Sequence, residues 1–514
     1  MLDYLWIVVS GGIASFITSM GIGANDVGNA FASSIGSKAL TVKSAVAIAS
    51  VFECAGAILM GSHVTKTIRK GIADYECFEE EPELLMYGCF CVLLSVGAWL
   101  FLASYLEMPV STTHSCVGGM IGMAMVTGGP ECVIWYKQTD SFPWIGGVSG
   151  IILSWFLSPI FSAMVASFIF FMTRCFVLRS KNSFDKSYRT FPIFVALTIT
   201  LNTFFIIYKG GRGVGLDQLS PRGALLIAVG TGVALGSLII PFIPRMKQSV
   251  HNRFQQNEQE MIGVNNIKNN NENNNGNNNG NNNRNKVSRC MGSIQKNMNY
   301  DMEEIKIGEI KEIHDSSEKF DEKTEESFKY LQIFTAICDS FSHGANDVAN
   351  AIGPYAAIVS IYLNEGELER TIDMDNYAYG ILALGGIGIS IGLLTYGYKV
   401  IRAIGVKLCC ITPSRGFSIE LGSATIIIIG SRLGIPLSTT HCQVGATMGV
   451  AALEDIKKCS GINWKIVWKV FLGWIITLIV VGTSTAILIA QGIYAPTKNI
   501  EQCDSIQNGT FMGR

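Results

Sequence analysis

The motif Gly-Ala-Asn-Asp-Val-Gly-Asn-Ala at residues 23–30 occurs a second time at residues 344–351, with a single substitution. A second motif, Pro-x-Ser-Thr-Thr-His, follows each copy, at residues 109–114 and 436–441. Two polar motifs in the same order, roughly ninety residues apart in both halves, indicate an internal duplication. The chain therefore contains two copies of one unit.

The composition is that of a polytopic membrane protein. Of the 514 residues, 49% are hydrophobic and only 15% are charged. The formal net charge of −1 provides no electrostatic basis for binding nucleic acid. The 14 cysteines are scattered without metal-ligand spacing, which favours buried thiols. Residues 1–37 contain no Lys or Arg, so we expect no cleavable signal peptide.

Apolar runs predict five membrane spans in each unit and two between them, about 12 transmembrane helices in an all-α fold. Seven spans separate the starts of the two units, and this odd number means that the repeats have inverted topology. The predicted domains are a first transmembrane repeat (1–173), two linking helices (174–244), a disordered Asn-rich cytoplasmic loop (245–328), a second repeat (329–495) and an external tail (496–514).

The loops set the expected orientation. Basic residues cluster at 174–189 and again at 245–253, and the positive-inside rule places both clusters in the cytoplasm. Both termini are then external, and the plasma membrane is the expected location. The segment Asn265–Asn285 is mostly asparagine and cannot form a core. Asparagine runs of this kind resemble those of malaria-parasite proteins, which concerns source and not mechanism.

Both copies of each motif lie in strongly apolar surroundings, where carboxylates and carboxamides are costly unless they bind something or line a wet cavity. Small residues in the first motif permit a broken helix, which is tolerated at membrane depth where it lines a cavity. An Asn-Asp pair can also be a simple helix cap. The motifs resemble the signature of the PiT family of inorganic phosphate transporters, which are sodium- or proton-coupled symporters. The resemblance covers both halves and not the middle.

The Ser-Thr-Thr triplets are candidate phosphate ligands. Hydroxyls and unpaired N–H groups at the positive end of a helix bind tetrahedral oxyanions. Inverted repeats can bring both triplets to one point near the membrane midplane. The alternative is that they are ordinary N-caps. The predicted phosphate-binding residues are Ser111, Thr112, Thr113, Ser438, Thr439 and Thr440.

The acidic motifs are candidate cation ligands, because a carboxylate beside phosphate needs an intervening positive charge. Sodium takes oxygen ligands, as calcium does. A proton could replace it, although the Asn residues favour sodium. The resemblance adds Glu53 and Glu420 as cation or proton ligands, and the alternative is that neighbouring polar groups satisfy each of them. The predicted sodium-binding residues are Asn25, Asp26, Asn29, Asn346, Asp347, Asn350, Glu53 and Glu420.

His114 and His441 end the two triplets, and either phosphate contact or packing explains them equally well. The sequence thus predicts sodium-coupled inward symport of phosphate by alternating access, without enzymatic activity or a cofactor. The expected partners are phosphate, sodium and the lipid bilayer, with a homodimer as an option. Rival functions are proton-coupled phosphate transport, sulfate transport, a channel and an intramembrane hydrolase. A hydrolase is disfavoured because no nucleophile has a separately oriented base.

Overall fold

The structure is a computed structural model. It describes residues 4–494 except 62–63, 66–67, 69–70, 140–143, 209–218, 257–314, 316, 365–375, 406 and 455–460. The predicted Asn-rich segment Asn265–Asn285 and the predicted tail 496–514 lie outside the described residues.

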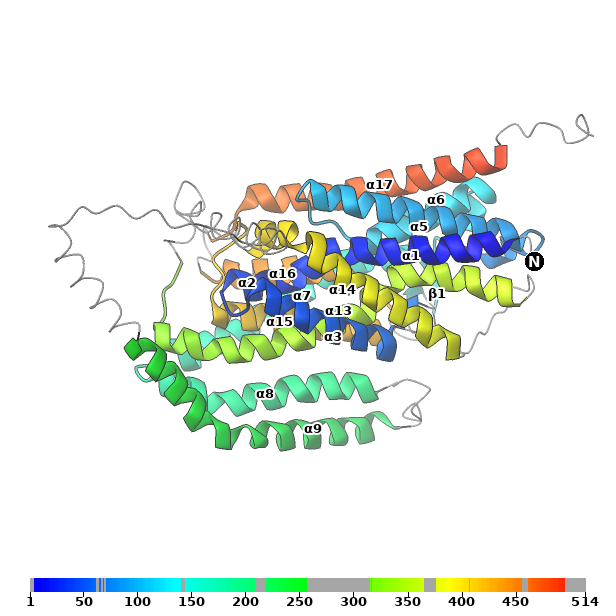
Figure 1. The fold of residues 1–514 in the computed structure, drawn as a ribbon. Coiled ribbons are helices and arrows are strands. Elements are labelled where there is room, and N and C mark those ends of the chain that lie inside the picture. Colours follow the sequence, from blue (N-terminus) through cyan, green and yellow to red (C-terminus); the bar gives the residue numbers. More distant parts are fainter. Residues whose placement is uncertain are drawn as a thin grey trace, which may run out of the picture.

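The described residues form an all-α membrane protein, as predicted (Figure 1). The first unit contains α1 (Leu5–Asn25), α2 (Val27–Gly36), α3 (Val42–Met60), α5 (Pro82–Tyr105), α6 (Thr112–Thr127) and α7 (Gly147–Thr173). The second contains α13 (Glu322–Leu363), α14 (Asn376–Gly405), α15 (Pro413–Arg432), α16 (Thr439–Ala452) and α17 (Trp464–Tyr494). Between them lie α8 (Ser183–Ile207) and α9 (Pro221–Leu238). A short hairpin, β1 (Lys137–Gln138) and β2 (Ile145–Gly146), precedes α7.

Six of the described helices are long and apolar enough to cross a membrane. Helix α17 illustrates how such a helix divides its faces: Gly473, Thr477 and Val481 are buried at helical spacing, whereas Ile479 and Ile487 are exposed. Helices satisfy their own backbone hydrogen bonds, which lipid cannot do. The exposed apolar face therefore suits a lipid environment, and the buried stripe of small residues suits close helix packing.

The two units are inverted relative to each other, and their last helices are exchanged. Figure 1 shows α1 and α13 running in opposite directions through the bundle. The short helix α6 packs against α17 of the other unit, and α16 packs against α7. Helices α6 and α16 have 16 and 14 residues. At 1.5 Å per residue they are about 24 Å and 21 Å long, too short for a hydrocarbon core of about 30 Å. Their N-termini therefore lie inside the bundle.

The helix breaks differ from the prediction for the Asn-Asp motifs. In the first unit the break is slight, since α1 ends at Asn25 and α2 begins at Val27 with Asp26 still in helical conformation. In the second unit α13 continues through the motif for 42 residues without a break. The extended segments occur instead before α6 and α16, where Pro109 and Pro436 cannot supply helical N–H groups.

The predicted disordered loop 245–328 has helical ends. The α9 segment continues as helix as far as Gln256. At the other end α13 begins at Glu322, where the side chain of Asp321 caps it by accepting from Thr324 N at 2.9 Å. Local capping and packing on α15 thus extend order into a stretch that composition assigned to the loop.

Two of the cysteines are paired, beside the buried thiols that the sequence favours. Cys77 and Cys132 form a disulfide that joins the segment between α3 and α5 to the segment after α6. Asp74 N also donates to Cys132 O, at 2.8 Å. The two cysteines are 55 residues apart in the chain, so their pairing is set by tertiary contacts and not by any local spacing.

The first glycine of each acidic motif is required by helix packing. A Cβ on Gly23 would lie 1.8 Å from Ile389 O of α14, and one on Gly344 would lie 2.2 Å from Glu53 O of α3. We expect Gly23→Ala and Gly344→Ala each to cost about 3 kcal/mol or more, because backbone cannot move aside as a side chain can. Thermal unfolding in detergent measures this. The control is Gly230→Ala in α9, where nothing lies within 4 Å of the new Cβ and stability should be unchanged or slightly raised. Wild-type stability in Gly23→Ala would contradict the packing argument.

Candidate functional site

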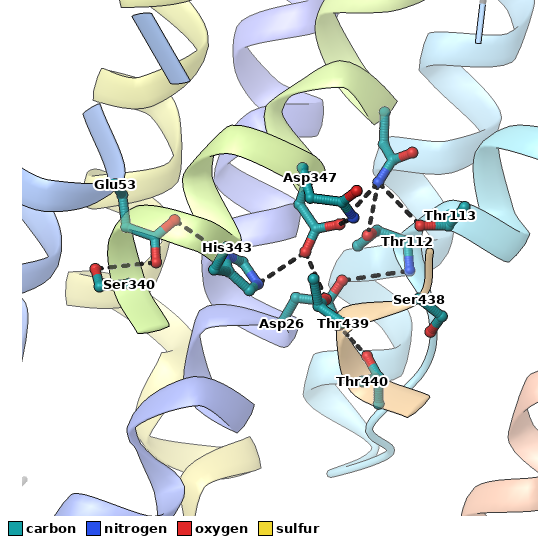
Figure 2. A network of polar contacts seen from close by, with 12 residues as sticks. Asp26, Glu53, Thr112, Thr113, Ser340, His343, Asp347, Ser438, Thr439 and Thr440 are labelled. Atoms are coloured by element: carbon teal, nitrogen blue, oxygen red, sulfur yellow. Dashed lines mark hydrogen bonds and ion pairs between the residues drawn. The ribbon is translucent and has the colours of Figure 1, made fainter. Parts of the chain in front are cut away.

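The polar motifs of both units meet where α6 and α16 begin. Ser111 and Ser438 are the N-caps of these helices: each hydroxyl accepts from the backbone N–H of the histidine three residues later, at 3.2 Å. The predicted alternative of ordinary capping therefore describes the two serines. The threonines that follow them point into the network drawn in Figure 2.

The threonine hydroxyls donate to the two motif aspartates. Thr440 Oγ1 donates to Asp26 Oδ1 at 2.6 Å, which joins the second unit to the first. Thr439 Oγ1 donates to Asp347 Oδ2, also at 2.6 Å. Thr112 N donates to Asp26 Oδ2 at 3.3 Å. All of these side chains are buried, so carboxylates hold the donors at the starts of both short helices (Figure 2).

Thr113 and Thr440, the last threonines of the two triplets, make contacts that cross between the units. Thr113 Oγ1 donates to Leu437 O at 2.9 Å, and Thr440 Oγ1 is 3.3 Å from Val110 O. Asn350 joins this arrangement, because its Nδ2 donates to Thr112 Oγ1 at 3.1 Å and to Asp347 Oδ1 at 3.2 Å. Thr112, Thr113 and Thr440 thus contact the loop or the acidic motif of the other unit, whereas Thr439 contacts Asp347 of its own unit.

Asn25 and Asn346 hold the extended segments in place. Asn25 accepts from Val110 N at 2.9 Å and donates to Met108 O at 3.0 Å. Asn346 donates to Leu437 O at 2.9 Å. Their amide groups position the approach to α6 and α16, and cation ligation by these residues stays a prediction. The side chain of Asn29 lies outside the described residues.

His343 is a site residue that the sequence reasoning missed. It lies on α13 between two carboxylates: its Nδ1 is 2.9 Å from Glu53 Oε2, and its Nε2 is 2.8 Å from Asp347 Oδ2. Ser340 Oγ also donates to Glu53 Oε1 at 3.2 Å. The available signal was the sequence itself, because His343 directly precedes the second Gly-Ala-Asn-Asp motif. It connects Glu53 to the site (Figure 2).

The two units differ at this point. In the first unit Ile22 stands where His343 stands in the second, directly before the motif glycine. Gly23 packs against Ile389 as Gly344 packs against Glu53, so Ile389 is the structural counterpart of Glu53. At one junction between the units Ile22 and Ile389 are both buried and apolar, whereas at the other junction Glu53 and His343 form a buried carboxylate–imidazole pair.

Glu420 lies away from the threonine network. It accepts hydrogen bonds from Ser33 at 2.7 Å and from Thr335 at 2.7 Å, and Ser34 and Gln332 donate to the same carboxylate. This is the predicted alternative in which neighbouring polar groups satisfy the carboxylate. The contacts join α2, α13 and α15, so Glu420 connects three helices that surround the site.

His114 and His441 pack against each other and against two tryptophans. Their ring centroids are 4.6 Å apart, and each ring lies tilted against a tryptophan, His114 against Trp155 at 3.7 Å and His441 against Trp474 at 3.6 Å. Each Nδ1 meets the carbonyl of the other tryptophan, at 3.3 Å and 3.0 Å. Of the two readings of these histidines, this geometry is that of packing.

The buried arginines are engaged elsewhere. Arg415 binds Glu454 Oε1 with its Nη2, at 2.6 Å. Arg432 Nη2 donates to Ile206 O at 2.8 Å. At the start of the segment leading into α13, two hydrogen bonds from Arg179 lower the pKa of Glu318. These cations fix helix ends, which leaves His343 as the basic side chain drawn in the network of Figure 2.

A model of the phosphate transporter family matches residues 22–485. The chain belongs to this family. It is 28% identical to sodium-dependent phosphate transporter 1 of Mus musculus over 95% of both chains. It is 30% identical to the phosphate-repressible phosphate permease of Neurospora crassa, over 96% of this chain and 98% of that one. A solved structure described as the sodium-dependent phosphate transporter matches it with a TM-score of 0.72 and 28% identity, over 95% of this chain and all of that one. By their names these relatives are transporters and not enzymes, in agreement with the predicted absence of enzymatic activity.

Proposed function

We propose that this phosphate transporter family member moves inorganic phosphate into the cell together with sodium, by alternating access at the site where α6 and α16 begin. The single observation that carries the proposal is the meeting of two inverted helix N-termini at one buried cluster of threonines and aspartates. Helix N-termini and hydroxyls suit a tetrahedral oxyanion. The names of the relatives support phosphate as that anion and sodium as the coupling ion.

The hydrogen bonds suggest how the two ligands are coupled. Asp26 and Asp347 now accept from Thr440, Thr439 and Thr112 N, which are donors that phosphate would use. A sodium ion bound to the carboxylates would draw them from these donors and neutralise charge that repels phosphate. Sodium would then raise phosphate affinity, and phosphate would raise sodium affinity by the same factor.

The inverted units and the disulfide bear on transport and orientation. Inverted repeats support alternating access, because one half can rock against the other about a central site.

Disulfides form in oxidising compartments, so Cys77–Cys132 favours an external position for the loops that it joins. That position agrees with external termini and a plasma-membrane location. The domain limits, the homodimer and the source indicated by the asparagine runs stay predictions.

Uptake of radiolabelled phosphate into proteoliposomes tests the proposal. With the purified full chain we expect uptake with external sodium and little with potassium at the same pH. Equal uptake in both salts with a dependence on an imposed proton gradient would assign coupling to protons. Radiolabelled sulfate tests the rival function, sulfate transport, because nothing in the threonine geometry excludes that tetrahedral anion. Uptake of sulfate without uptake of phosphate would overturn the substrate assignment.

The threonine hydroxyls yield a matched pair of variants. We expect Thr113→Val and Thr440→Val each to weaken phosphate binding at saturating sodium by roughly five- to 150-fold, since a buried hydroxyl contributes about 1 to 3 kcal/mol. Phosphate concentration series of uptake measure the effect. Thr231→Val in α9 is the control, because that hydroxyl bonds only within its own helix in an exposed position. A normal phosphate affinity in both site variants would exclude the threonines as ligands.

A further inference from the structure

The side chains of Asp26, His343 and Asp347 bring one nitrogen and two carboxylate oxygens together within 4.8 Å of one another, all of them buried. Two ligands of a tetrahedral zinc ion lie about 3.3 Å apart, given metal–ligand distances of 2.0 to 2.2 Å. His343 Nε2 and Asp347 Oδ2 lie 2.8 Å apart. A separation of the two atoms by about a further half ångström would let both bind one metal ion.

A small cavity adjoins Asp26 and His343. It measures about 10 Å³ and is lined by Asp26, His343 and Thr439 together with Asp339, Ser423 and Gln443, the size that one water or one small ion requires. Several buried polar atoms on its lining have no hydrogen-bond partner: Asp339 Oδ1, His343 Nε2, Ser423 Oγ and both polar atoms of the Gln443 amide. Buried polar groups are seldom left unpaired, so this group of atoms is built to receive a polar or charged species.

Glu53 identifies the class of that species. A histidine that binds a metal through one nitrogen typically gives its other nitrogen to a carboxylate, which fixes the ring and its tautomer. Glu53 Oε2 lies 2.9 Å from His343 Nδ1 in that position, and Ser340 holds Glu53 in turn. An imidazole is a poor partner for sodium but a preferred one for zinc, cobalt and related first-row cations.

We propose that Asp26, His343 and Asp347 form a binding site for a divalent first-row transition metal, with Glu53 as the supporting carboxylate and the adjoining cavity as its open position. The two aspartates are shared with the proposed sodium site. A transition metal bound there excludes sodium and arrests transport. The arrest rests on the proposed function, whereas metal binding itself does not.

Cobalt absorption provides the direct test on the full chain purified in detergent and free of phosphate. We expect one equivalent of Co²⁺ to produce visible ligand-field bands that Zn²⁺ removes. His343→Gln should abolish the bands, and Glu53→Gln should weaken Co²⁺ binding about 10- to 100-fold. His251→Gln is the matched control, because that exposed histidine bonds only to Gln255 and should leave the bands unchanged.

A double variant controls for the possibility that a single variant loses the Co²⁺ bands because it misfolds. Glu53→Ile with His343→Ile copies Ile389 and Ile22, the equivalent positions at the other junction between the units, so it should fold and bind no Co²⁺. An absence of bands in the wild type, or their persistence in His343→Gln, overturns the metal site. Uptake with Zn²⁺ adds a separate readout: phosphate uptake that Zn²⁺ does not inhibit overturns the shared site, while Co²⁺ binding without any phosphate uptake overturns only the proposed function.

Discussion

Replacing His343 by Ile is expected to destabilise the protein by about 3 to 5 kcal/mol, and adding Glu53→Ile to the same chain is expected to restore most of that loss. The single change leaves Glu53 buried with Ser340 as its remaining hydrogen-bond donor. Removing one partner of a buried charged pair is strongly destabilising, whereas replacing both by apolar groups of similar volume is often close to neutral. Ile22 and Ile389 are the counterparts of His343 and Glu53, and both are buried in one apolar cluster, so the fold accepts isoleucine at the equivalent positions.

A double-mutant cycle measures this coupling. It compares thermal unfolding of the wild type, both single variants and the double variant. The expected signature is a strong coupling between the two positions, with either single variant less stable than the double. His251→Ile at an exposed position serves as the control for the loss of an imidazole and should change stability little. Additive losses, with the double variant least stable, would show that the two residues do not act as a pair.

The duplication could be read from the sequence, because its evidence is local and repeated. Motifs 23–30 and 344–351 recur with one change, and the threonine triplets follow each of them at similar distances. Their convergence follows from inversion, which needs only the number of spans. The threonine and aspartate contacts of both units confirm that these residues lie together, although their ligands stay a prediction.

Other features depended on contacts that no local pattern reveals. The asparagine side chains could serve as ion ligands or hold a loop, and only the positions of Met108, Val110 and Leu437 show that Asn25 and Asn346 hold loops. The pairing of His343 with Glu53 joins residues 290 positions apart. The counterpart of His343 in the first unit is Ile22. A comparison of the two repeats finds the residues that they share, and it therefore does not find His343.

The sodium proposal makes its largest prediction at Asp26 and Asp347. We expect Asp26→Asn and Asp347→Asn each to raise the sodium concentration for half-maximal uptake by roughly 30- to 150-fold, since a charged ligand in a buried site contributes about 2 to 3 kcal/mol. Phosphate must be saturating in this comparison, because linkage makes each ligand's affinity depend on the other. Asp185→Asn is the control: that exposed carboxylate pairs with Lys247 at the surface, where ion pairs contribute little.

The two substitutions should also differ from each other. Asp347 Oδ2 lies 2.8 Å from His343 Nε2 and accepts from Thr439 Oγ1, whereas Asp26 accepts from Thr440 Oγ1 and Thr112 N. Asp347→Asn should therefore lower thermal stability more than Asp26→Asn, while both weaken sodium dependence. If one substitution abolishes sodium dependence and the other leaves it intact, sodium is held by one unit alone. The second copy of the motif would then serve the fold, and the inverted symmetry would describe architecture without describing the ion site.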